Sequence, residues 1–98
     1  MYEKNPFVYI MASGHNGTLY IGVTSNLIQR VWQHKHDKKG FTGRYEVFDL
    51  VYFESHVSME AAIQREKQIK EWQRQWKMRL IEESNPLWRD LWRDILRR

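Results

Sequence analysis

The stretch FVYIMASGHNGTLYIGVTSNLIQRVWQH, residues 7–34, decides the fold of this 98-residue chain. It opens with two short segments rich in β-branched and aromatic residues, 7–11 and 18–23. The turn between them contains Asn16-Gly17, and both residue types tolerate the positive φ angles of tight turns. The stretch therefore predicts an antiparallel β-hairpin followed by a helix.

The residues after the hairpin predict one more strand and three helices. Thr24-Ser25-Asn26 can cap a helix that runs from residue 27 to about residue 37, before two glycines break it. A third strand is expected over 48–53, and two helices are expected between Ser58 and Asn85-Pro86. The predicted fold class is α/β, with the order β-β-α-β-α-α.

An amphipathic tail completes a chain that is long enough for one domain and too short for two. We expect a single domain over residues 1–98, with its core at about 6–84 and a C-terminal helix over about 86–97. A four-residue repeat in this helix would set Trp88 beside Trp92. Such a pair can stack on bases, but core packing or a dimer contact is its more frequent use.

The positive charge of the chain is concentrated in one stretch. The net charge is +4, from 16 basic and 12 acidic residues. The whole excess lies between residues 30 and 44, where Asp37 meets five basic residues: Arg30, Lys35, Lys38, Lys39 and Arg44. We expect these five residues to bind nucleic acid, although a lysine-rich loop can also be plain solvated surface.

Composition excludes several other classes of protein. The chain has no cysteine, which rules out disulfides, thiolate zinc sites and a cysteine nucleophile. No apolar run reaches the ~20 residues that span a bilayer, and the N-terminus lacks the layout of a signal peptide. We therefore expect a cytoplasmic protein without a membrane partner, either a monomer or a weak dimer.

Two strand tyrosines are the first candidates for chemistry. Tyr9 and Tyr20 each have apolar neighbours on both sides, so each faces away from those neighbours. Paired across the hairpin, the two phenols can share one face of the sheet and reach one water or phosphate oxygen. The alternative is ordinary sheet packing, because cross-strand aromatic pairs stabilise sheets.

Arg30 and His34 lie one turn apart on the first predicted helix, at the border between its apolar stripe and its polar face. An arginine there can bind two phosphate oxygens, and an imidazole can act as an acid or a base. The alternatives are an arginine stem packed on the core and a histidine on the helix surface.

The carboxylate of Glu66 falls in the middle of an apolar stripe, between Ala62 and Ile69. Burial of a charge costs several kcal/mol unless the charge is paired or bound to a metal. An ion pair, for example with Arg30, is one solution. A divalent cation completed by waters and a substrate phosphate is the other, because Mg²⁺ often binds through a single carboxylate.

These residues together resemble the GIY-YIG nuclease superfamily, in its small stand-alone bacterial branch (UPF0213), which is related to the N-terminal nuclease domain of the bacterial excinuclease. The resemblance covers about residues 8–91. Its motifs are Val8-Tyr9-Ile10, Tyr20-Ile21-Gly22, Thr24-x-Asn26-Leu27-x-x-Arg30-x-x-x-His34, Ala61-Ala62-x-x-Arg65-Glu66-x-x-Ile69-Lys70-x-Trp72, Lys77-x-x-Leu80-Ile81 and Asn85-Pro86-x-Trp88-x-Asp90-Leu91.

The resemblance implies a three-stranded antiparallel sheet flanked by helices, with the first triplet on the middle strand. It also implies metal-dependent cleavage of DNA phosphodiesters with Mg²⁺ or Mn²⁺. In the implied site Tyr20 is the general base, Tyr9 orders the water and Arg30 clamps the phosphate. His34 assists proton transfer or positioning, and Glu66 is the sole protein ligand of the metal.

The chain departs from the family pattern at several positions. Val8 replaces the first glycine, and Val23-Thr24-Ser25 stand where many relatives carry a lysine. Met78 stands where many have an asparagine, for which Asn85 is a candidate substitute.

The expected function is thus a DNA endonuclease of repair or recombination, with a possible protein partner in a repair complex. Two other functions stay open on the sequence. One is a non-catalytic nucleic-acid-binding module, and the other is a small adaptor that uses the Trp88/Trp92 segment.

Overall fold

The computed structural model describes residues 5–97. Its strands β1 (Phe7–Ala12), β2 (Leu19–Thr24) and β3 (Asp49–Ser55) form one antiparallel sheet in the order β2-β1-β3. The helices within these residues are α1 (Leu27–His36), α2 (Phe41–Arg44), α3 (Met59–Glu71), α4 (Arg74–Ser84) and α5 (Trp92–Leu96). The predicted α/β order is confirmed, with α2 added. No helix of this part of the chain is long and apolar enough to cross a membrane.

The hairpin forms as predicted and puts the first triplet on the middle strand. All six residues of β1 are buried, because this strand is covered on both faces. Tyr9 lies opposite Gly22, and Tyr20 lies opposite Met11. Asn16 in the connecting turn adopts a φ of 60°, which asparagine tolerates better than most residues.

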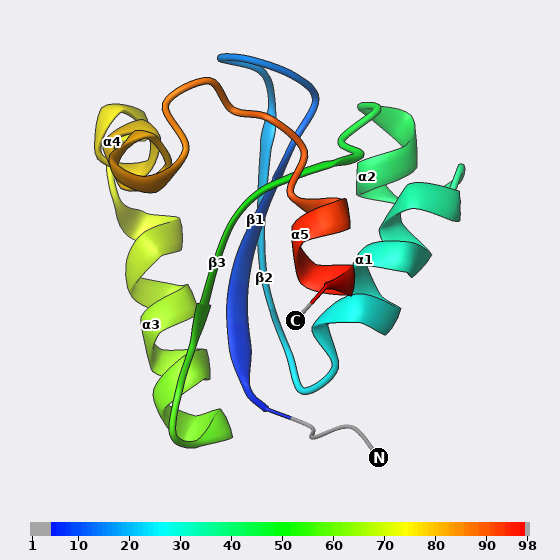
Figure 1. Cartoon of the computed structure of the whole chain (residues 1–98). Helices are drawn as coiled ribbons and strands as arrows, with labels where there is room; N and C mark the ends of the chain where they lie inside the picture. The colour runs from blue at the N-terminus through cyan, green and yellow to red at the C-terminus, as the bar shows by residue number, and fades with distance from the viewer. Residues whose placement is uncertain (1–4, 98) are drawn as a thin grey trace.

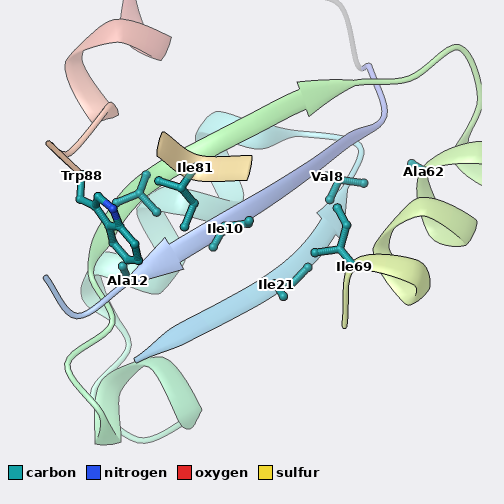
Figure 2. Close-up of a cluster of buried hydrophobic side chains, with 9 residues drawn as sticks. Val8, Ile10, Ala12, Ile21, Ala62, Ile69, Ile81 and Trp88 are labelled. Carbon is teal, nitrogen blue, oxygen red and sulfur yellow. The ribbon is translucent and has the colours of Figure 1, made fainter. Parts of the chain in front are cut away.

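Helices cover both faces of the sheet, with α3 and α4 on one side and α1, α2 and α5 on the other (Figure 1). The core on the α3 side, shown in Figure 2, consists of Val8, Ile10, Ala12, Ile21, Val51, Ala62, Ile69, Ile81 and Trp88. The core on the α1 side consists of Phe7, Tyr9, Met11, Leu27, Val31, Val47, Leu50 and Ile95. Successive residues of β1 alternate between the two cores, as the two-residue period of a strand requires.

Side-chain caps begin two of the helices where the sequence predicts them. The side chain of Asn26 accepts a hydrogen bond from the backbone N–H of Gln29 at the start of α1. The hydroxyl of Ser58 accepts one from Ala61 at the start of α3. Each cap satisfies an N–H group that has no partner within its helix.

The C-terminal segment differs from the expected helix over 86–97, because the chain turns before α5 begins. The Asn85 amide donates to the carbonyls of Val51 and Arg89, and its oxygen accepts from the Arg89 N–H. Trp88 takes a φ of 56°, which ends any continuous helix there. Asn85 therefore has a structural role, because it ties the turn after α4 to β3.

The two tail tryptophans consequently do not lie side by side. Trp88 is buried in the core on the α3 side, next to Ile81 and Ala12 in Figure 2. Trp92 packs against the other core, across the sheet. The expectation of core packing is confirmed, whereas the paired-tryptophan surface of the adaptor interpretation does not exist.

Candidate active site

Tyr9 and Tyr20 share the face of the sheet that α1 covers. Their ring centroids lie 6.3 Å apart. The ring of His34, from α1, lies 5.6 Å from Tyr9 and 4.9 Å from Tyr20. The alternation of strand residues and the spacing along α1 thus bring the three rings together, as expected from the sequence.

A hydrogen-bonded chain runs through this cluster from β1 to α2. The Tyr9 Oη and His34 Nε2 atoms are 2.7 Å apart, and His34 Nδ1 is 3.2 Å from the hydroxyl oxygen of Thr42. All three residues are buried. Thr42 is a member of the cluster that sequence reasoning missed.

The charge states in this chain follow from burial. Burial, helped by the positive charge of Arg30, lowers the pKa of His34 to about 4, against an opposing effect of Asp37. Burial, with a smaller contribution from Tyr20, raises the pKa of Tyr9, and Arg30 opposes this rise. At neutral pH we therefore assign a Tyr9 hydroxyl that donates to Nε2 of a neutral imidazole, whose Nδ1–H donates to Thr42.

Arg30 reaches the same place from one turn earlier on α1. Its guanidinium donates to the Gln33 side-chain oxygen at 3.0 Å. Burial acts to lower the pKa of Arg30, but interactions with Tyr9 and Tyr20 outweigh it and the pKa is raised. The guanidinium is thus a fixed positive charge beside both phenols.

These groups open onto a pocket of about 390 Å³ between β2, α1 and α2. Its lining consists of Tyr20, Arg30, Gln33, His34, Asp37, Gly40, Phe41 and Thr42. Tyr9 is absent from the lining and is fully buried. Tyr9 interacts with three residues of this lining, His34, Arg30 and Tyr20.

Glu66 comes from the other helical layer. Its side chain is only 13% exposed, which agrees with its place in the apolar stripe of α3. Its carboxylate pairs with Lys70 Nζ at 2.9 Å and not with Arg30. The structure thus groups Tyr9, Tyr20, Arg30 and His34, whereas α3, the helix that carries Glu66, packs on the other face of the sheet.

The basic residues of the 30–44 stretch divide into two kinds. Lys38, Lys39 and Arg44 are exposed, as a nucleic-acid-binding surface requires. Lys35 differs from the expectation, because its ammonium donates to the Phe48 carbonyl at 2.9 Å and to Asp90 at 2.5 Å. Lys35 therefore ties α1 to Phe48, just before β3, and to Asp90 in the C-terminal segment, and we leave it out of the proposed interface.

The fold is that of a small α/β domain with one three-stranded antiparallel sheet, and comparison with known proteins gives its family. The family model "GIY-YIG catalytic domain" matches residues 5–79, so the chain belongs to the GIY-YIG family of nuclease domains.

Curated relatives narrow this family assignment. A UPF0213 protein of Staphylococcus epidermidis is 35% identical over 80% of this chain and 95% of its own length. A UPF0213 protein of Syntrophus aciditrophicus is 34% identical over 84% of this chain and 94% of its own length. No solved structure gives a significant match.

The depressed pKa of His34 predicts a pH-dependent stability. Between the ordinary histidine pKa and about 4, the unfolded chain binds a proton at this position and the folded chain does not. The contribution of His34 to the free energy of unfolding is therefore complete above pH ~6.5. It decreases by about 2–3 kcal/mol as the pH falls toward 4. Urea unfolding at pH 7 and pH 4.5 should show a larger loss for the wild type than for His34→Gln. Equal losses of unfolding free energy in the wild type and in His34→Gln would contradict a lowered pKa of His34.

Proposed function

We propose that this protein is a divalent-metal-dependent endonuclease that hydrolyses phosphodiester bonds of nucleic acid, with DNA as the expected substrate and repair or recombination as the setting. The observation that carries the proposal is the pocket in which Tyr20, Arg30 and His34 meet. Membership in the GIY-YIG family supports the same chemistry.

Tyr20 is the proposed general base, because it is the tyrosine that lines the pocket. Tyr9 is unsuited to that role, since its raised pKa keeps the phenol protonated and burial keeps it from a substrate water. In the proposed step, the deprotonated Tyr20 oxygen beside the Arg30 guanidinium takes a proton from a water in the pocket, and that water attacks phosphorus. The bond from phosphorus to the 3′ or 5′ oxygen breaks, and the leaving oxygen takes a proton from solvent. Tyr9 and Thr42 hold the His34 ring, whose neutral form can relay a proton within the cluster.

Arg30 is the proposed phosphate clamp. Its planar guanidinium can donate two parallel hydrogen bonds to non-bridging phosphate oxygens, and its charge stabilises the charge that builds up in the transition state. The neighbouring Lys38, Lys39 and Arg44 are proposed to hold the nucleic-acid backbone, which predicts binding that weakens with salt.

Glu66 is the proposed metal ligand, and its chemistry fits Mg²⁺ or Mn²⁺. It offers a carboxylate, and among residues 5–97 only Lys70 pairs with that group. No set of three or more His, Asp or Glu side chains in this part of the chain could hold an ion alone. Waters and a substrate phosphate would therefore complete the coordination.

The edge of the sheet formed by β2 is where such a metal could meet the tyrosine cluster. β2 is an edge strand that carries Tyr20 on the face covered by α1, and it also contacts α3, the helix that carries Glu66. When bound, the cation would supply Lewis-acid neutralisation of phosphate charge.

The test is cleavage of labelled single-stranded, duplex and branched DNA, and of RNA, in Mg²⁺, Mn²⁺ or EDTA. We expect cleavage that needs metal and is lost in Tyr20→Phe and in Glu66→Ala. If the wild type cleaves none of these substrates in either metal but binds them, the proposal is wrong and the chain is a binding module. Circular dichroism of each variant verifies that it is folded.

A further inference from the structure

A row of aromatic rings leads from the pocket to the surface along α2. The Tyr20 ring lies 5.8 Å from Phe41, and Phe41 lies 4.8 Å from Tyr45. Phe41 and Tyr45 are 47% and 49% exposed, although aromatic rings of this size usually lie in the core. We call Phe41 and Tyr45 the aromatic rim of the pocket.

The structure holds this rim in place from the inside. Thr42, between the two rings in sequence, is buried, and its carbonyl accepts a hydrogen bond from the Val47 N–H at 2.7 Å. Before the helix, the Asp37 carboxylate accepts hydrogen bonds from the N–H groups of Lys39 and Gly40. Because α2 is anchored at both of these points, the exposed rings are presented in a defined position.

Two further aromatic side chains, Trp32 and Trp76, are exposed, but neither lines the pocket. Trp32 stacks on His36, at a centroid distance of 4.0 Å, and Trp76 has an edge contact with Trp72 at 6.3 Å. Phe41, in contrast, is part of the pocket wall, together with Arg30 and His34. Whatever stacks on the rim is therefore adjacent to whatever occupies the pocket.

The charges around the rim indicate the chemistry of the occupant. Three basic residues lie near the two rings in sequence: Lys38 and Lys39 precede Phe41, and Arg44 directly precedes Tyr45. None of the three forms an ion pair within residues 5–97. Flat aromatic faces interleaved with free cations are the combination that binds single-stranded nucleic acids, whose bases stack while the backbone meets the cations. The bases of a duplex are stacked on one another and offer no free face.

We propose that the aromatic rim stacks unpaired bases next to the phosphate in the pocket, so that the preferred substrate is single-stranded nucleic acid or an unpaired segment. This inference rests on the proposed function for the placement of the phosphate. In the sequence, Trp88 and Trp92 are the residues considered for base stacking, with core packing as their more frequent use. The structure instead assigns base stacking to a segment whose glycines predict only a loop.

The test measures binding without cleavage, by fluorescence anisotropy in EDTA at fixed salt. The probes are a labelled oligothymidylate, an abasic strand of the same length and charge, and a duplex of that length. We expect the wild type to bind oligothymidylate more tightly than either other probe. Phe41→Leu and Tyr45→Leu should each weaken oligothymidylate binding by about 5- to 100-fold and leave abasic-strand binding unchanged.

The matched control is Trp76→Leu, which removes an exposed aromatic ring from α4 and should leave all three affinities unchanged. The inference is overturned if the wild type does not distinguish oligothymidylate from the abasic strand, or if both rim variants bind oligothymidylate as the wild type does. Because these measurements need no catalysis, they are separate from the nuclease proposal. Rim-dependent binding without cleavage of any substrate would support stacking and refute the nuclease.

Discussion

Arg30→Met is expected to reduce kcat/KM for phosphodiester cleavage by about 10²–10³, the usual effect of removing a donor that stabilises transition-state charge. Arg30 is the only side chain of the pocket lining that is cationic at neutral pH, since the pKa of His34 is lowered to about 4. Within the lining, no other group can replace its charge. The measurement is steady-state cleavage of the best substrate of the wild type at saturating metal.

The loss should fall mainly on kcat, because Lys38, Lys39 and Arg44 lie outside the pocket lining and continue to hold the backbone. Arg30→Lys keeps the charge but loses the planar donor pair, so we expect an intermediate rate. Lys39→Met is the matched control: it should weaken binding and reduce the salt dependence while kcat is preserved. If Arg30→Met and Lys39→Met lower kcat equally, Arg30 contributes only general charge.

The parts of the site that follow from local periodicity were predictable from the sequence. Alternation along a strand is enough to place Tyr9 and Tyr20 on one face, and the turn at Asn16-Gly17 brings the two strands together. Helical spacing is likewise enough to place Glu66 among buried residues of α3. These inferences need only the geometry of one element or of one hairpin.

The parts that depend on contacts between distant segments were not predictable. Thr42 reaches His34 only because the chain reverses after α1, and no spacing rule connects them. The charge of Lys35 is visible in the sequence, but its pairing with Asp90, 55 residues away, is not. The four-residue repeat of the tail fits a helix, yet the Asn85 side chain binds the backbone and turns the chain instead.

Gly22→Ala is the second large effect that we expect. A Cβ atom at position 22 would lie 2.4 Å from Tyr9 Oη and 2.5 Å from Tyr9 Cζ, both far inside normal contact distance. Tyr9 is fully buried and bonded to His34, so its ring has little room to move. Overpacking and loss of the Tyr9–His34 hydrogen bond should together lower the free energy of unfolding by about 2–4 kcal/mol, measured by urea denaturation.

The glycine of the second triplet is thus explained by the tyrosine of the first, which lies against it across the hairpin. A double-mutant cycle tests this coupling. In a Tyr9→Val background the ring is gone, so Gly22→Ala should cost much less than it does in the wild type. An equal cost in both backgrounds would mean that the glycine serves the strand backbone and not the tyrosine. Because a displaced Tyr9 no longer holds His34, Gly22→Ala should also lower the cleavage rate at temperatures where the variant is still folded.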